Sequence, residues 1–269
     1  MQLTVVVENQ TCSQQLLAEW GYCAWLESDE RVILLDTGGI QHTLCHNLSA
    51  LGLNASRITD LILSHGHFDH TSGVMDILRL SPKTRLWAAP SIGRERLGDK
   101  DAKRSSGGGS MLAGLCIHPV DPHIEVAPGI TAFTVPLSER DPRWVCTHHM
   151  FERTPEGQII PDTFSDDVSV LIQTSKGASL LLGCAHAGLP NILAYVRKTF
   201  GIEIFDTVLG GTHLSSVPPN DYPLWMEELS KYKVLHWRPC HCTGFKAAAT
   251  LAKHFSDVDW AAAGTWHEL

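Results

Sequence analysis

The segment from Leu61 to Gly73 constrains the fold of this chain more than any other. It begins with a short apolar run, typical of a buried strand, and then places three histidines and one aspartate within six positions: His65, His67, Asp69 and His70. Imidazole nitrogen and carboxylate oxygen are ligands that suit zinc, manganese or iron at a catalytic centre. A polar helix start capped by Ser64 or Asp69 would account for only one of the four residues. The segment therefore predicts a strand that ends at a functional metal site.

Composition limits the kinds of protein that can carry this site. The chain has 269 residues, of which 43% are hydrophobic and 19% are charged, so it can bury a large core as an ordinary globular protein. A formal net charge of −8 argues against nucleic acid as the main partner, because phosphate binding requires a basic surface. The N-terminal residues lack the pattern of a signal peptide, and no apolar run is long enough to span a bilayer. We therefore expect a cytoplasmic protein with a small-molecule substrate and with no nucleic-acid or membrane partner.

Cysteine and histidine are both frequent. The eight cysteines do not follow a disulfide-rich spacing, so we expect free thiols in a cytoplasmic protein. The fifteen histidines make up more than one residue in twenty, and this surplus is a further indication of metal chemistry.

Strand-like and helix-like patterns alternate along the chain. Apolar, β-branched-rich runs predict strands at residues 3–8, 21–26, 32–35, 58–63, 85–88, 124–126, 130–135, 168–173, 179–182, 204–209 and 233–237. Apolar residues at helical spacing predict helices at residues 41–51, 73–80, 190–200, 221–231 and 244–255. This order predicts an α/β fold built from layers. Because the sequence contains neither a clear linker nor a tandem repeat, we expect one domain over residues 1–269.

Two segments depart from this alternation. Residues 99–110 are charged and rich in serine and glycine, which predicts a mobile surface loop near 99–115 or, alternatively, a substrate lid. As a lid, Lys100, Lys103 and Arg104 would meet an anionic substrate. Residues 138–165 contain prolines and little periodicity, and an irregular excursion is expected there.

A single pattern recurs at five places: an apolar strand, a turn marked by glycine or proline, and then a histidine or carboxylate. These places are Asp36, His65 to His70, Cys184 to His186, His213 and His241. Each later histidine, taken alone, is more readily a helix-start or surface residue than a functional one. Strand ends in a layered α/β fold can converge on one edge, where ligands commonly bind, so the shared position favours a common site.

These motifs resemble those of the metallo-β-lactamase-fold metallohydrolases. Residues 65–70 match the H-x-H-x-D-H motif, and residues 36–38 match the preceding D-T-G turn. The likeness is closer to the subgroup labelled 7,8-dihydropterin-6-methyl-4-(β-D-ribofuranosyl)aminobenzene-5′-phosphate synthase-like, whose further motifs correspond to residues 183–188, 210–214 and 240–244. The resemblance spans the chain from the first strand to the last helix. It implies a four-layer αββα sandwich with a site at one edge.

The resemblance also implies roles for individual residues. One metal would be bound by His65, His67 and His186, and a second by Asp69, His70 and His241. Asp36 would orient a ligating histidine from outside the coordination shell. The two ions would be divalent, with zinc expected and iron or manganese as alternatives.

The chain departs from the family pattern at two positions. Cys184 replaces the usual bridging aspartate, and it could bridge both ions, bind one of them or only pack. The usual histidine of the third motif has no clear counterpart, and the candidates for its place are Asp166, Asp167, His148 and His149.

Two adjacent ions suit hydrolysis at a carbonyl or phosphorus centre, with a metal-bound hydroxide as nucleophile and Asp69 among the catalytic residues. The substrate would be small and anionic, either phosphate-bearing or pterin-like. His213 would act as hydrogen-bond donor or proton shuttle, or it would merely cap the next segment. One alternative is a pterin-transferring synthase of the dihydropteroate-synthase type, as the subgroup label suggests. Another is a non-catalytic metal-containing ligand-binding or sensor protein.

Overall fold

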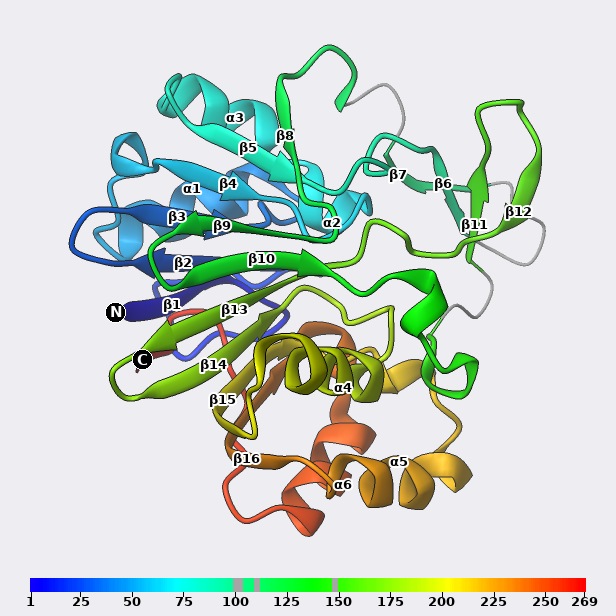
Figure 1. Cartoon of the computed structure of the whole chain (residues 1–269). Coiled ribbons are helices and arrows are strands. Elements are labelled where there is room, and N and C mark those ends of the chain that lie inside the picture. Colours follow the sequence, from blue (N-terminus) through cyan, green and yellow to red (C-terminus); the bar gives the residue numbers. More distant parts are fainter. Residues whose placement is uncertain (99–103, 109–111, 147–149) are drawn as a thin grey trace.

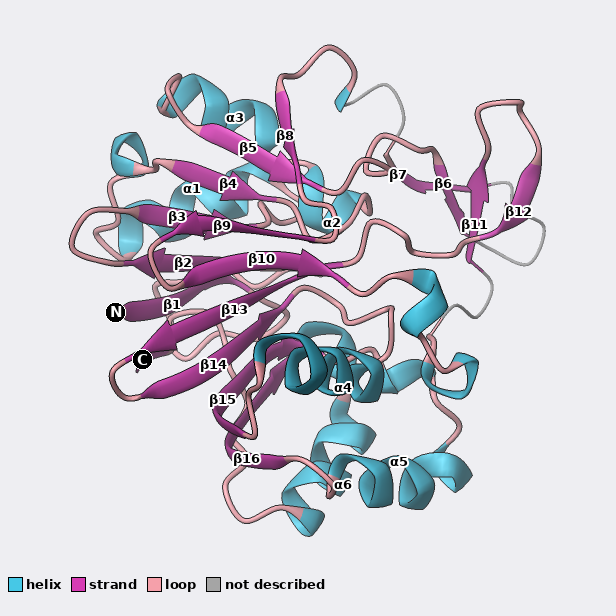
Figure 2. Cartoon of the chain, in the orientation of Figure 1, coloured by secondary structure: helices cyan, strands magenta, loops and turns pink. Residues whose placement is uncertain are grey.

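Two β-sheets pack face to face in a computed structural model of the chain, and helices cover both outer faces (Figure 1; Figure 2). The structure describes residues 1–98, 104–108, 112–146 and 150–269. The α/β class and the αββα layering expected from the sequence are confirmed.

The first sheet has the strand order β17-β1-β2-β3-β4-β5-β8. Its strands are β1 (Gln2–Val7), β2 (Cys23–Glu27), β3 (Val32–Leu35), β4 (Asp60–Ile62), β5 (Arg85–Ala88), β8 (Ile117–Pro119) and β17 (Trp266–Glu268). β3, β4, β5 and β8 run parallel, whereas β1, β2 and β17 pair antiparallel with their neighbours.

The second sheet has the order β16-β15-β14-β13-β10-β9. Its strands are β9 (His123–Ala127), β10 (Ile130–Thr134), β13 (Val168–Thr174), β14 (Gly177–Leu182), β15 (Ile204–Gly211) and β16 (Lys233–Cys240). β14, β15 and β16 are parallel and in register, so that Leu182, Gly210 and Pro239 lie side by side. The segments that follow these strands therefore begin at the same level.

Three groups of buried side chains fill the spaces between the four layers. One, which includes Val170 and Leu181, lies between the sheets. A second packs α1 (Gln41–Ala50) and α3 (Val74–Leu80) on the first sheet. The third packs α4 (Leu189–Phe200), α5 (Tyr222–Leu229) and α6 (Phe245–His254) on the second. Each sheet is thus apolar on both faces, which explains the nearly continuous hydrophobic runs of its central strands.

The chain also forms a third, four-stranded sheet, and three of its strands lie where the sequence predicts a loop and an irregular excursion. It has the order β12-β11-β6-β7, with β6 (Arg96–Gly98), β7 (Arg104–Gly107), β11 (Met150–Arg153) and β12 (Ile159–Pro161). Two single-turn helices, Leu137–Glu139 and Pro142–Trp144, also lie in the excursion. These strands were not predicted because each has only three or four residues, many of them polar, and such short segments show no periodic pattern of hydrophobic residues. Lys100 and Lys103 of the expected loop lie outside the described residues.

Among the described residues, no helix combines the length and apolar character that crossing a membrane requires. The single-domain organisation and the cytoplasmic location stay predictions.

Candidate metal centre

The ends of the parallel strands carry the polar residues that the sequence singled out. Asp36 follows β3, residues 64–70 follow β4, and Cys184 and His186 follow β14. His213 follows β15 and His241 follows β16. The structure brings all of these segments together at one edge of the two sheets, where the named histidine and cysteine side chains and Asp69, but not Asp36, form overlapping groups of possible metal ligands.

The first group consists of His65, His67 and His186. All three side chains are buried, and their ligand atoms lie within 4.8 Å of one another. His65 Nε2 and His67 Nδ1 are 3.0 Å apart, and His186 Nε2 is buried without a hydrogen-bond partner among the described residues. Two nitrogens on a tetrahedral zinc ion lie roughly 3.3 Å apart, because each Zn–N bond is about 2.0–2.1 Å long. The group therefore fits a cation of this size.

The second group consists of Asp69, His70 and His241, whose ligand atoms also lie within 4.8 Å of one another. His70 Nε2 is 3.2 Å from His241 Nε2, and Asp69 Oδ2 lies 3.9 Å from the His70 nitrogen and 3.5 Å from the His241 nitrogen. These side chains are buried too. The group offers two imidazoles and one carboxylate to a second cation.

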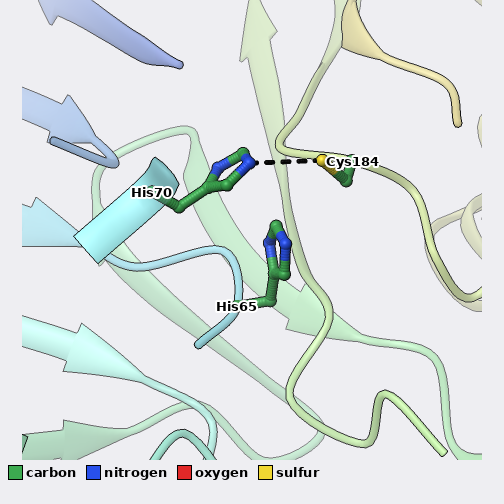
Figure 3. Close-up of side chains that lie close together, drawn as sticks. All are labelled: His65, His70 and Cys184. Carbon is green, nitrogen blue, oxygen red and sulfur yellow. Dashed lines mark hydrogen bonds between the residues drawn. The ribbon is translucent and has the colours of Figure 1, made fainter. Parts of the chain in front are cut away.

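Cys184 lies beside both groups. Its Sγ atom is 3.2 Å from His70 Nε2, and it forms a further possible ligand set with His65 and His70 (Figure 3). Figure 3 shows the two imidazole rings and the sulfur directed toward the same space. Cys184 thus faces the centre, as a bridging ligand would.

The outer nitrogens of four histidines are held by neighbouring groups. Asp36 Oδ2 lies 2.7 Å from His70 Nδ1, and Asp36 also accepts hydrogen bonds from the Ser64 backbone N–H and hydroxyl. Ser64 Oγ is 2.9 Å from His65 Nδ1. His186 Nδ1 donates to the backbone carbonyl of Cys146, and His241 Nδ1 donates to the side-chain oxygen of Asn9, both at 3.1 Å. Such outer contacts fix the ring orientation of metal-ligating histidines.

Burial keeps the first group uncharged. It lowers the pKa of His67 to about 4, and burial with neighbouring histidines lowers the pKa of His65 and His186 well below the usual value. In the second group, burial opposes the charged ring of His70, but Asp36 and Asp69 outweigh it and raise the pKa of His70 to about 9. Burial favours neutral Asp69, yet His70 and His241 outweigh it and lower the pKa of the carboxyl. The second group therefore binds a proton that a cation would displace.

Several residues at the strand ends have left-handed backbone. The φ angles are +60° at Asp36, +55° at Ala185, +53° at His213 and +49° at His241. For residues other than glycine this conformation costs of order 1–3 kcal/mol and often occurs at functional sites. At these four positions the left-handed conformation turns the chain sharply where a strand ends.

The aspartates proposed for the third motif make other contacts. Asp166 accepts a hydrogen bond from the Gly66 N–H at 2.8 Å and pairs with Arg96 at 2.7 Å. Asp167 accepts one from the Ala187 N–H at 2.9 Å. Neither belongs to a possible ligand group among the described residues. His148 and His149 lie outside the described residues.

Four residues at or beside the ligand groups were not predicted from the sequence to take part in a metal site: Ser64, Asn9, Arg96 and Cys242. Cys242 lies within residues 240–244, which match one of the subgroup motifs, so that motif could have indicated it. Arg96 is a buried charged residue in a short strand, and no local sequence pattern indicates its burial.

Comparison with known proteins assigns the chain to a family. The model of the Metallo-beta-lactamase superfamily matches residues 21–155. The chain therefore belongs to the metallo-β-lactamase superfamily, as its motifs indicated.

Two proteins of Methanocaldococcus jannaschii are similar in sequence. One, named 7,8-dihydropterin-6-methyl-4-(beta-D-ribofuranosyl)-aminobenzene-5′-phosphate synthase, is 28% identical over 242 residues, covering 84% of this chain and 80% of that protein. The other, an uncharacterized protein, is 27% identical over 259 residues, covering 93% and 94%.

Solved structures share the fold. A metal-dependent hydrolase of the beta-lactamase superfamily has a TM-score of 0.85 and 24% identity, with 100% of this chain and 99% of that chain covered. A diphosphatase of the PhnP family has a TM-score of 0.57 and 13% identity, with 100% and 97% covered.

Proposed function

We propose that the chain is a metal-dependent hydrolase that holds two divalent cations and acts on a small, anionic substrate. One cation is held by His65, His67 and His186, and the other by Asp69, His70 and His241. The observation that carries this proposal is the convergence of two buried ligand groups, with the Cys184 sulfur beside both. Zinc suits this mixture of imidazole, carboxylate and thiol, with iron and manganese as alternatives.

Two bound cations lower the pKa of a shared water and stabilise charge on the attacked centre and its leaving oxygen. Asp69 remains ionised because the two histidines beside it lower the pKa of its carboxyl. One carboxylate oxygen can therefore bind a cation while the other orients the attacking water. The His213 ring lies 4.2 Å from the His186 ring and is partly exposed, which suits a proton donor to the leaving group.

The position of β7 supports an anionic substrate. Gly107, at its end, pairs with His67, so the strand lies directly against the metal-binding loop. Arg104 stands at the other end of this four-residue strand and is exposed. A cationic side chain thus lies one short strand away from the metal-binding segment, and the similar synthase is named for a phosphate-bearing product.

A second candidate is a pterin-transferring synthase. The similarity to the synthase of M. jannaschii extends over 84% of this chain, and its name describes a condensation product rather than a hydrolysis product. The same two ligand groups would then hold cations that stabilise a leaving diphosphate. A non-catalytic ligand-binding protein would keep the cations and lack turnover with any substrate.

Metal analysis of purified variants tests the centre. We expect His65→Ala to lose one cation and Asp69→Ala to lose the other, because each removes one member of a three-residue group. His42→Ala, on the exposed face of α1, is the matched control and should keep both cations. Unchanged metal content in both site variants would refute the centre.

Activity assays separate the candidate functions. The metal-loaded protein is offered phosphodiesters, thioesters and lactones, and separately a dihydropterin diphosphate with a phosphorylated ribosyl aminobenzene. Hydrolysis that disappears in His65→Ala supports the hydrolase, whereas condensation supports the synthase. Ligand-induced stabilisation without turnover in any assay supports the binding protein. Full kcat and KM of His213→Ala on an active substrate would exclude the proton-donor role of His213.

A further inference from the structure

Two buried cysteines lie next to each other at the metal centre, and the proposed function does not use the second one. Cys184 follows β14, and Cys242 lies in the single helical turn His241–Thr243 after β16. Together with His213 they form a group whose ligand atoms all lie within 4.8 Å of one another. This group shares Cys184, but no other member, with the set formed by His65 and His70.

The backbone is shaped to admit the Cys242 sulfur. A Cβ atom on Gly211 would lie 2.6 Å from Cys242 Sγ and would also collide with the carbonyl oxygen of Gly183. Glycine at position 211 is therefore required for the sulfur to occupy its place between β14 and β16. The Gly210-Gly211 pair at the end of β15 thus allows close approach of neighbouring atoms.

The sulfur receives a polar contact suited to a thiolate ligand. The backbone N–H of His213 donates to Cys242 Sγ at 3.2 Å, and the left-handed backbone of His213 directs that N–H toward the sulfur. Hydrogen bonds to sulfur are among the means by which proteins tune thiolate–metal sites. The Cys242 thiol also contacts the Cys184 carbonyl oxygen at 3.7 Å.

The imidazole of the group has unused bonding capacity. His213 Nδ1 is buried and has no hydrogen-bond partner within the part of the chain that the structure describes. A buried polar atom without a partner costs free energy unless it binds something. A cation beside the two sulfurs would satisfy it.

We propose that Cys184, His213 and Cys242 form an additional cation site, which takes a thiophilic ion such as zinc, cadmium or copper(I). Two sulfurs and one imidazole make a softer ligand set than the imidazole and carboxylate groups beside it, so magnesium and manganese are disfavoured. Three protein ligands leave a fourth tetrahedral position open. Cys184 joins this site to the neighbouring centre. The inference goes beyond the proposed function, because it concerns the binding of an additional cation and does not depend on turnover of a substrate.

The experiment compares Cys242→Ser with wild type after loading with cobalt(II), whose thiolate complexes absorb in the near ultraviolet. Wild type should show the sulfur-to-cobalt band, and Cys242→Ser should lose roughly half of its intensity because one of two thiolates is gone. Metal analysis should also show one ion fewer in the variant. Cys45→Ser, in α1 and outside every possible ligand group found among the described residues, is the matched control and should equal wild type.

A second measurement keeps the test valid if Cys242→Ser does not fold. Wild-type protein is alkylated with and without cadmium and analysed by mass spectrometry, and cadmium should protect Cys184 and Cys242 together. Equal alkylation in both states, or an unchanged cobalt band and ion content in Cys242→Ser, would overturn the proposal. Loss of ions in His65→Ala with full protection of Cys242 would separate this site from the centre of the proposed function.

Discussion

The two halves of the metal centre are built in different ways. The first half, residues 65–70, comes from one continuous segment that enters the short helix α2 (Phe68–Thr71), and buried charged groups hold it in place. The second half, which contains His186, His213 and His241, comes from three separate strand ends where the backbone turns sharply. The comparison shows two physical routes to the same result: charge pairing fixes a compact motif, whereas strand register and backbone strain assemble dispersed residues.

Buried charge surrounds the first half on both sides. On one side Asp36 holds His70 and Ser64. On the other, Asp166 accepts the Gly66 N–H and is paired with Arg96, whose side chain is 0% exposed. Arg96 also pairs with Asp162 at 3.0 Å, so this one guanidinium ties the small third sheet to the metal-binding loop.

Strand register builds the second half. β14, β15 and β16 are parallel neighbours with Leu182, Gly210 and Pro239 aligned. The chain leaves the three strands at nearly the same level, and left-handed residues then redirect it toward the possible ligand groups. No charged network comparable to that of Arg96 is needed, because the sheet itself fixes the starting positions.

The strongest test of the first half is Arg96→Leu. Removing this guanidinium leaves Asp162, Asp166 and Glu152 buried without their shared partner, and breaking such a buried pair costs about 3–5 kcal/mol. Burial already raises the pKa of Asp162 to about 7 with Arg96 beside it. We expect a large fall in the free energy of unfolding, measured by urea denaturation of the metal-free protein at neutral pH.

Arg94→Leu is the matched control for that variant. Arg94 pairs with Glu152 from the same network, but its side chain is 37% exposed, so its loss should cost at most about 1 kcal/mol. Equal losses for the two arginines would mean that burial of the charge does not hold the first half in place.

The pH dependence of metal binding is the next largest effect. The pKa of His70 in the folded, metal-free protein is about 9, above its ordinary value of 6.5. The charged ring therefore stabilises the metal-free protein. This stabilisation is complete below pH 6.5 and is lost as the pH rises through 9. Metal binding must displace this proton, so cation affinity at pH 7 should be about fiftyfold lower than at pH 9 and about a hundredfold lower than its limit at higher pH. Competition with a chelator across this range measures it. A flat profile would contradict the pairing of His70 with Asp36.

Asp36→Asn should have a smaller effect on the same quantity. Loss of an outer carboxylate that orients a ligating histidine typically lowers metal affinity about 10–100-fold. The variant should also flatten the pH profile, because Asp36 is the principal group that raises the pKa of His70. Asp60→Asn is the control: Asp60 is equally buried in β4 but pairs with Arg85 and Trp87, so its loss should change stability and leave metal affinity unchanged. If Asp36→Asn and wild type had equal cation affinities at pH 9, Asp36 would not orient His70.

The same contrast explains what could be predicted from the sequence. The first half was visible because its residues lie within six positions after an apolar run, and the layered fold was visible because the central strands are continuously apolar. The residues of the second half were recognised through glycine-marked strand ends and family motifs, since no spacing rule connects His186 with His241. The groups that support them were not predicted. Arg96 acts through contacts with residues more than fifty positions away in the sequence. The left-handed backbone at Ala185 could not be predicted, because alanine as a residue type does not indicate a positive φ angle.

The smallest predicted effect tests backbone strain in the second half. Ala185 and Ala187 lie in one turn and in one buried cluster, but only Ala185 has a positive φ angle. Replacing either by glycine loses a buried methyl group and adds chain entropy to the unfolded state, together about 1–2 kcal/mol. At position 185 the change also relieves about 1–2 kcal/mol of left-handed strain. Ala185→Gly should therefore be nearly neutral, and Ala187→Gly should be less stable by about 1 kcal/mol or more in urea denaturation of the metal-free protein. If both variants lost the same stability, strain at this strand end would be negligible, and sheet register alone would account for the second half of the centre.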